Sequence, residues 1–213
     1  MVAPYYQDSS CTIYHGDCRD ILPHLEPVDL VLTDPPYGMS FRSNHRTKKH
    51  LPIHGDDFLP LDLIELSIMK ASAAAYVFCR WSNLKELPDP TSVIVWVKNN
   101  WSMGDLDHEH AKQWEACCFY RKEKHRWSER GRPSDIIRAE RTGNDLHPTE
   151  KPIKIFHWLI SHNVGETILD PFMGSGTTLV AAKNLGRKAI GIEIEEKYCE
   201  IAVKRLRQEV LAL

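Results

Sequence analysis

The sequence lacks the features that mark a secreted or membrane-bound chain. Residues 1–8 hold no basic start followed by an apolar core, so no secretion signal is expected. No apolar run approaches the roughly 20 residues that a membrane span requires. These absences lead us to expect a cytoplasmic protein that has no membrane partner.

The chain also lacks the cysteine and histidine spacings that mark metal or redox sites. Its six cysteines form no C-x-x-C pair and stand at no zinc-ligand spacing from histidine. Most of them lie in or beside apolar runs, where cysteine behaves as a small hydrophobic residue. The eleven histidines are scattered. We therefore expect reduced thiols and no bound metal.

A strong excess of charge is missing as well, because the formal net charge is −2. The total charge therefore does not indicate a nucleic-acid binder, but the charged residues are distributed unevenly. Residues 42–49 contain Arg and Lys and no acid, whereas residues 121–141 are rich in Arg and Lys interleaved with acids. Local basic segments matter more for phosphate contact than the total charge. Either segment could equally be solvated surface.

The chain has the size and composition for one substantial core, with 213 residues of which 42% are hydrophobic and 26% charged. Strand-like and helix-like patterns alternate, which indicates α/β architecture. The predicted strands are 11–15, 28–33, 74–79, 92–98, 115–120, 167–170 and 188–193. The predicted helices are 19–25, 62–72, 84–87, 152–160, 177–185 and 196 to about 210. Residues 38–58 and 121–146 are predicted to be irregular.

Two motifs stand at the ends of predicted strands. Asp34-Pro35-Pro36-Tyr37 follows the apolar run 28–33, which reads as a strand buried on both faces. Asp170-Pro-Phe-Met-Gly174-Ser-Gly176-Thr-Thr178 joins a strand to a helix, and a G-x-G at that point lets a ligand approach the backbone. Glu193 ends the next strand, where a carboxylate can bind ribose hydroxyls. Leu179 replaces the third glycine of the dinucleotide fingerprint, which weakens a nicotinamide-cofactor reading.

Together, these motifs resemble those of amino-group DNA methyltransferases, and their order resembles the circularly permuted β class. The resemblance implies a Rossmann-like class I methyltransferase fold with helices on both faces of a mostly parallel seven-stranded sheet, one strand being antiparallel. It implies a single domain over 1–213. The catalytic half would cover about 11–120, a short target-recognition segment 121–146, and the cofactor half 147–213. The strand at 11–15 would supply the element that the permuted order requires at the N-terminus.

The resemblance implies S-adenosylmethionine as cofactor and assigns residues to it. Asp17 would bind the adenine amino group, and Glu193 the ribose. His147, Thr149 and Lys151 belong to a segment that looks like the family's H-P-T-x-K-P motif, which holds the methionine carboxylate. The remaining predicted cofactor residues lie in the second motif: Asp170, Pro171, Phe172, Gly174, Ser175, Gly176 and Thr177.

Asp34 and the Pro35 carbonyl would accept the two N–H bonds of a target amine, Pro36 would stiffen the turn, and Tyr37 would stack on a base flipped out of double-stranded DNA. Asp rather than Ser at position 34 favours adenine N6 over cytosine N4, and the lack of a Pro-Cys motif argues against cytosine C5. The predicted DNA contacts are Arg42, Arg46, Lys48, Lys49, Trp127, Arg130 and Arg132.

Two alternatives to a DNA methyltransferase stay open. One is an inactive DNA- or cofactor-binding protein on the same fold, and the other is an RNA or protein-glutamine methyltransferase. The resemblance implies a bacterial or phage-infected cell and association with the nucleoid. The sequence does not tell whether the chain forms a homodimer or works with a restriction endonuclease.

Overall fold

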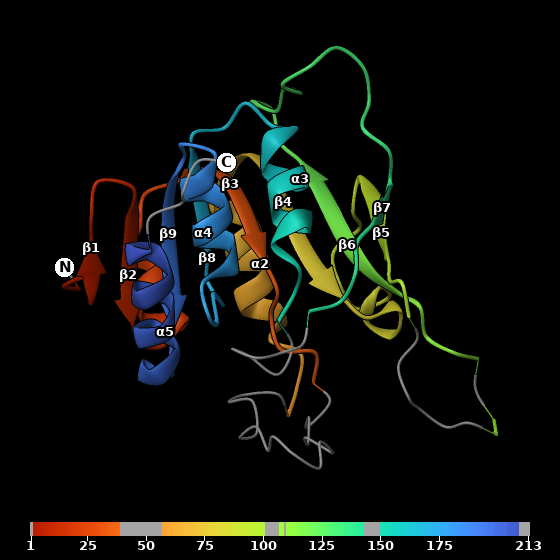
Figure 1. The fold of residues 1–213 in the computed structure, drawn as a ribbon, viewed down its shortest axis with the longest axis horizontal. Helices are drawn as coiled ribbons and strands as arrows, with labels where there is room; N and C mark the ends of the chain where they lie inside the picture. Colours follow the sequence, from red (N-terminus) through yellow and green to blue (C-terminus); the bar gives the residue numbers. More distant parts are fainter. Residues whose placement is uncertain (1, 39–56, 101–106, 109, 143–149, 209–213) are drawn as a thin grey trace.

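The computed structural model describes residues 2–38, 57–100, 107–108, 110–142 and 150–208. Within these ranges nine strands form one sheet in the order β1-β2-β9-β8-β3-β4-β6-β5-β7 (Figure 1). Their bounds are β1 Tyr6–Gln7, β2 Cys11–His15, β3 Val28–Thr33, β4 Ala71–Cys79, β5 Ser92–Val97, β6 Trp114–Arg121, β7 Ile136–Arg138, β8 Thr167–Asp170 and β9 Lys188–Glu193.

The seven predicted strands are all present, and β6 is the one among them that runs antiparallel to its neighbours β4 and β5. The strands β2, β9, β8, β3 and β4 are mutually parallel. Two short edge strands were not predicted: β1 pairs antiparallel with β2, and β7 pairs parallel with β5. They hold two and three residues, too few for an alternating apolar pattern to be recognised in the sequence.

Helices cover both faces of the sheet, as predicted (Figure 1). Helices α3 (Ile153–Ser161), α4 (Thr177–Asn184) and α5 (Glu196–Arg207) pack on one face, and α1 (Cys18–Ile21) and α2 (Leu61–Lys70) on the other. The 3₁₀ turns are η1 (Leu22–His24) and η2 (Trp81–Asn83). The helix predicted over 84–87 is wrong, because the helical turn lies just before it in η2.

Side chains of the central strands alternate between two cores, which is the period of two expected of a strand. On β4, Tyr76 and Phe78 face the core under α3, α4 and α5, whereas Ala75 and Val77 face the core under α1 and α2. All four side chains are almost completely buried. The sheet is therefore covered on both faces at its centre, which leaves its strand ends as the place for a site.

The six cysteines are free thiols, and each is buried. No helix among the described residues is long and apolar enough to cross a membrane. The division of the chain into a catalytic half, a recognition segment and a cofactor half stays a prediction, and one sheet runs through all three.

Candidate active site

The carboxyl ends of the parallel strands bring the two motifs together at one edge of the sheet (Figure 1). Asp34 follows β3, Asp170 ends β8 and Glu193 ends β9. Ligand sites of open α/β sheets form at this edge. The pocket there is lined by residues 16–19, 34–37, 58, 60, 63, 150, 151, 156, 170–175, 177, 178, 192–195, 197 and 198.

Two backbone N–H groups hold the Glu193 carboxylate at one end of this pocket. The N–H of Gly174 donates to Oε2 at 2.9 Å, and the N–H of Glu195 donates to Oε1 at 2.8 Å. Gly174 has a φ of 51°, a left-handed conformation that glycine adopts without strain. Burial raises the pKa of Glu193 to about 7, although the two N–H groups act in the opposite direction. The carboxylate is therefore fixed in place and can still accept hydroxyl donors.

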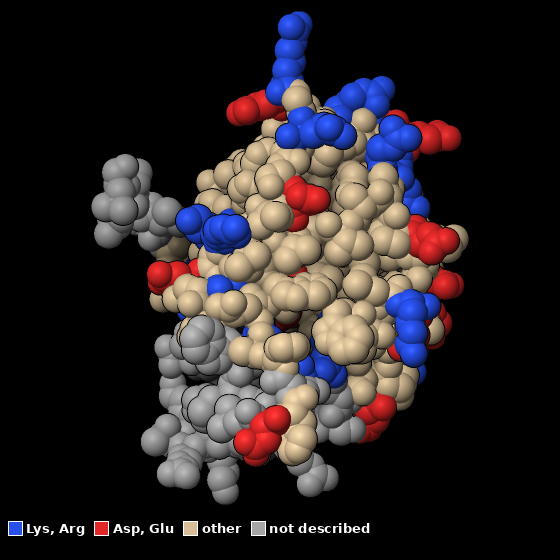
Figure 2. Space-filling view, turned by 90° about the vertical axis from the view of Figure 1, so that its right-hand side faces the viewer, with Lys and Arg blue, Asp and Glu red and all other residues tan. Residues whose placement is uncertain are grey.

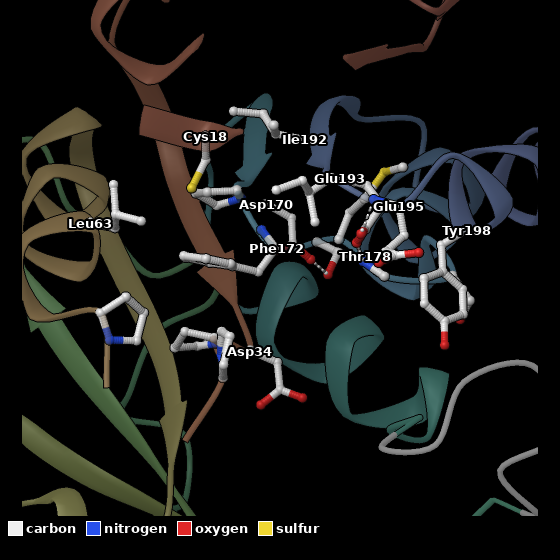
Figure 3. A pocket seen from close by; sticks show the side chains of 18 of the residues that line it. Cys18, Asp34, Leu63, Asp170, Phe172, Thr178, Ile192, Glu193, Glu195 and Tyr198 are labelled. Carbon is white, nitrogen blue, oxygen red and sulfur yellow. Dashed lines mark hydrogen bonds between the residues drawn. The ribbon is translucent and has the colours of Figure 1, made fainter. Parts of the chain in front are cut away.

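An apolar wall lies beside Glu193 (Figure 3). Phe172 lies deep in the pocket, with Cys18, Leu63 and Ile192 around it. Asp17 also lines the pocket, and its Oδ1 accepts from the backbone N–H of Arg19 at 2.9 Å, which caps α1. The wall is suited to a flat aromatic group, and the predicted bond from Asp17 to an adenine amine stays a prediction.

Asp170 joins the two halves of the site, because protein donors bind both of its carboxylate oxygens. Its Oδ1 accepts from the Thr33 hydroxyl at 2.7 Å and from the N–H of Phe172 at 3.1 Å, and its Oδ2 accepts from the Thr178 hydroxyl at 2.5 Å. Its side chain is nearly completely buried, and burial raises its pKa to about 6. Asp170 lines the pocket, as does Pro171, but its main contacts hold β3, β8 and α4 together.

Arg205 of α5 organises the loop that precedes α4. Its Nη1 donates to the Ser175 carbonyl at 2.8 Å and lies 3.1 Å from both the Ser175 and the Thr177 hydroxyl oxygens. Ser175 and Thr177 line the pocket, whereas Gly176 does not. Gly176 instead packs on α5, where a Cβ would lie 2.7 Å from the Ala202 Cβ. Gly176 thus has a packing role, and its predicted contact with a ligand stays a prediction.

Asp34 lies at the other end of the pocket, in contact with two donors. The Tyr37 hydroxyl donates to Oδ1 at 2.5 Å, and the Lys151 ammonium group donates to Oδ2. Lys151 also donates to the Tyr37 hydroxyl at 2.9 Å and lies 3.4 Å from Oε2 of Glu115. Burial raises the pKa of Asp34, and Lys151 and Tyr37 oppose that rise.

The ammonium group of Lys151 stays charged in this buried position. Burial alone would lower its pKa, but Asp34 and Glu115 raise it above the ordinary value. Because the ammonium group is shared by these two carboxylates, its contacts do not favour the predicted role at a methionine carboxylate. His147 and Thr149, the other predicted residues of that motif, lie outside the described residues.

Pro35, Pro36 and Tyr37 of the predicted catalytic motif all line the pocket. The Tyr37 carbonyl accepts a bond of 3.5 Å from the side-chain amide of Asn83, which is buried in η2. This bond ties the motif to the turn after β4. The stacking role of Tyr37 stays a prediction.

The predicted DNA contacts divide into two groups. Arg42, Arg46, Lys48 and Lys49 lie outside the described residues. The segment with Trp127, Arg130 and Arg132 lies at the amino ends of the parallel strands, because Lys122 and Lys124 bond to the start of β4 and Ser128 to the residue after α3. Figure 1 shows this segment at the end opposite the motif loops, and Figure 2 shows Lys and Arg side chains crowded at that upper end.

The interpretation of Trp127 as a DNA wedge is therefore corrected. Its ring stacks on Phe119 at 5.6 Å between centroids and meets the His125 ring edge-on at 4.3 Å. Its aromatic surface is used in packing against the core beneath α3. Arg130 and Arg132 are exposed, but they belong to this segment, which Ser128 ties to the residue after α3, at the end of the sheet away from Asp34. The predicted contacts with a target base do not fit that position.

Sequence reasoning missed several residues at the site: Thr33, Lys98, Glu115 and Arg205. Each lies outside the two motifs, and only the sheet pairing or the packing of α5 brings it to them. The described residues contain no group of three or more His, Cys, Asp or Glu side chains that could hold a metal ion.

The family model described as DNA methylase matches residues 28–204, which is most of the chain and includes both motifs. The chain belongs to the DNA methylase family. The curated Type II methyltransferase M2.DpnII of Streptococcus pneumoniae is 28% identical over 260 residues, covering 98% of this chain and 94% of the relative. The Type II methyltransferase M.HinfI of Haemophilus influenzae is also 28% identical, covering 98% of this chain and 71% of that protein.

Solved structures of similar proteins agree with this DNA methylase assignment. The M1.HpyAVI–SAM complex is 27% identical, with a TM-score of 0.71 and coverage of 92% of this chain and 99% of that chain. The PvuII DNA methyltransferase, described as cytosine-N4-specific, has the same TM-score at 16% identity and shows the shared fold alone. The class I methyltransferase fold is thereby confirmed, and the circular permutation stays a prediction.

Proposed function

We propose that this DNA methylase transfers a methyl group from S-adenosylmethionine to an exocyclic amino group of a base in DNA. The main support is one pocket that is lined at one end by the Glu193 carboxylate, which backbone N–H groups bind, and at the other end by Asp34. This arrangement supports a cofactor and an amine meeting between them. The M1.HpyAVI–SAM complex, at 27% identity, supports the same cofactor.

The residues of the pocket fit that cofactor. The Glu193 carboxylate, fixed by Gly174 and Glu195, would accept the ribose hydroxyls, and the wall around Phe172 would hold the adenine. The loop that Arg205 organises would face the methionine end through Ser175 and Thr177. When bound, S-adenosylmethionine supplies an electrophilic methyl group on a sulfonium that leaves readily.

The protein's own task is to orient the amine. An amino group on an aromatic ring is a poor nucleophile because its lone pair is delocalised into the ring. Asp34 and the Pro35 carbonyl would accept its two N–H bonds and favour a pyramidal nitrogen. To reach the amine, Asp34 must exchange the donor from Tyr37 or Lys151 for the N–H of the base. Fixed acceptors and orientation supply most of the acceleration in such a site.

The substrate is DNA, and the base has to leave the duplex to reach a pocket of this kind. We propose that DNA approaches the carboxyl end of β4 and the adjacent amino end of the antiparallel strand β6, where two tryptophans are exposed. Trp81 is 59% exposed in the turn that holds Tyr37 through Asn83, and Trp114 is 43% exposed at the start of β6. The pairing of Cys79 with Ala116 supports their lying near each other. Aromatic faces there suit stacking on bases.

We propose adenine N6 as the target, with cytosine N4 as the second candidate. The presence of Asp at position 34 favours adenine. The shared fold does not decide the question, because the cytosine-N4-specific PvuII enzyme has the same TM-score as the M1.HpyAVI complex.

The test is transfer of a tritiated methyl group from S-adenosylmethionine to unmethylated duplex DNA, followed by nucleoside analysis. We expect N6-methyladenine, and N4-methylcytosine would move the assignment to the second candidate. Asp34→Ala should abolish transfer and leave cofactor affinity within about tenfold, because the carboxylate faces the amine. Absence of transfer to DNA, with cofactor binding intact, would favour an inactive binding protein. Transfer to RNA or protein instead would also overturn the proposal.

A further inference from the structure

A row of side chains with alternating charges leads from Lys98, at the end of β5, to Asp34. Lys98 follows β5, and its Nζ donates to Oε1 of Glu115 at 2.5 Å. Oε2 of Glu115 lies 3.4 Å from the Lys151 ammonium group, which donates in turn to Asp34. The side chains of Lys98 and Lys151 are 9% and 4% exposed. Two cations and two anions therefore share one largely buried region.

Pairing of β5 with β6 fixes the backbone positions of Glu115 and Lys98. Glu115 pairs with Trp96 in the β5–β6 ladder, and the backbone N–H of Lys98 donates to the Gln113 carbonyl. The Lys98 ammonium group also lies 5.0 Å from the centroid of the Trp96 ring. Buried ion pairs are costly to desolvate and contribute little net stability. The cost of burying these four charged groups favours a functional role for them.

We propose that Glu115, anchored by Lys98, competes with Asp34 for the Lys151 ammonium group and so tunes the Asp34 carboxylate as an acceptor for the target amine. This inference rests on the proposed function. If Lys151 were bound to Asp34 alone, the Asp34 carboxylate would be a weak acceptor for a new N–H. If no cation lay beside it, the buried carboxylate would take up a proton. Sharing Lys151 with Glu115 keeps Asp34 ionised and leaves it able to accept the N–H of the amine. Glu115 and Lys98 are thus positioning residues that act through Lys151.

The sign of each effect follows from the geometry. Removing the charge of Glu115 gives Lys151 wholly to Asp34, which lowers the pKa of Asp34. Removing the charge of Lys98 leaves Glu115 to draw Lys151 away, which raises the pKa of Asp34. The titratable groups that face Asp34 from the surrounding elements are Tyr37, Cys79, Glu115, Cys117, Lys151 and Asp170.

The test uses the full chain and two variants, Glu115→Gln and Lys98→Met, which keep side-chain length while removing charge. The single-turnover rate of methyl transfer is measured against pH with saturating cofactor and DNA. We expect the acid limb of the pH–rate profile to move to lower pH in Glu115→Gln and to higher pH in Lys98→Met. Each shift should be at least about half a pH unit, which is about threefold in rate on that limb. Lys98→Arg should restore the original profile. Matched controls are Glu129→Gln and Lys122→Met, at the far end of the sheet.

A second readout needs no activity. In protein with ¹³C-labelled aspartate carboxyls, with the Asp34 signal assigned by Asp34→Asn, the titration of Asp34 should shift in the same opposite directions. A uniform loss of rate, with both the limb and the carbon titration unmoved, would show that the row of charges is purely structural and would overturn the inference. Shifts of the same sign in both variants would also overturn it. Failure of the proposed function would look different, because the wild type itself would then transfer no methyl group to DNA at any pH.

Discussion

The Thr33 hydroxyl donates to Oδ1 of Asp170 across 137 residues of sequence, at 2.7 Å, and both side chains are buried. This bond joins the last residue of the strand before Asp34 to the last residue of the strand before the glycine loop. It therefore fixes the distance between the amine end and the cofactor end of the site.

Thr33→Val should remove this link while keeping the shape of the side chain. Asp170 would lose one of its three donors inside the protein, which should lower the free energy of unfolding by about 1–3 kcal/mol. Urea unfolding measures this change, and Thr33→Ser is the control that keeps the hydroxyl. Equal stability of the valine and wild-type proteins would contradict the role assigned to the bond.

Glu193 should make stability depend on pH in a specific direction. Burial raises its pKa from 4.5 to about 7, so the folded state holds this proton more tightly than the unfolded state. The contribution of this group to stability is therefore complete below about pH 4.5 and declines as the pH rises to about 7, by roughly 3 kcal/mol in all. Glu193→Gln should lack this decline.

Urea unfolding at pH 5 and pH 8 checks the difference between the two proteins. Asp170, whose pKa is also raised, remains in both proteins, and its repulsion of the Glu193 carboxylate is part of the difference that is measured. The same variant should weaken cofactor binding by roughly 1.5–3 kcal/mol, measured by calorimetry, because hydrogen bonds to a charged acceptor are lost. Unchanged affinity would remove Glu193 from the cofactor site.

Arg205 should control cofactor affinity without touching the pocket itself. Arg205→Met removes the donor shared by the Ser175 carbonyl and two hydroxyl groups, so the glycine loop loses its support from α5. We expect cofactor affinity to fall by roughly tenfold, on the scale of one charged hydrogen bond. Arg205→Lys should recover most of it, since one nitrogen makes all three contacts. A lysine variant as weak as the methionine variant would argue that shape, and not donation, matters.

The sequence predicted the seven central strands, the faces covered by helices and the two motif loops, because each depends on local patterns. The apolar run 28–33 and the glycines at 174 and 176 are readable without tertiary information. The location of a ligand site could also be predicted, because the carboxyl ends of parallel strands meet on one side of the sheet.

The contacts that the sequence did not predict are those that sheet pairing creates. Glu115 reaches Lys151 only because β6 is paired with β5 and β4, and the pattern of residues 114–121 says nothing about that neighbour. Trp127 is similar, since a tryptophan among arginines suggests nucleic-acid binding until its packing on Phe119 is known. Strands such as β7 were not predicted for a different reason, because three residues are too few to show an alternating apolar pattern.

The two basic segments should differ in their effect on DNA binding. Arg42, Arg46, Lys48 and Lys49 follow Tyr37 closely in sequence, so we propose that they contact phosphates around the flipped nucleotide. Replacing all four with Gln should weaken binding to all sequences alike. It should also flatten the dependence of log affinity on log salt by about 0.9 for each lost contact. Cofactor affinity should not change.

The matched control is the double variant Arg130→Gln and Arg132→Gln, in the segment that is bonded to the start of β4 and to the residue after α3, at the amino ends of the parallel strands. A duplex seated at the carboxyl ends of the strands would not reach them, so the control should keep the wild-type salt slope. Fluorescence anisotropy of labelled duplex DNA over a range of salt concentrations measures both slopes. If the double variant flattened the slope and the quadruple variant did not, DNA would have to bind across the amino ends of the strands. The approach proposed here, past Trp81 and Trp114, would then be wrong.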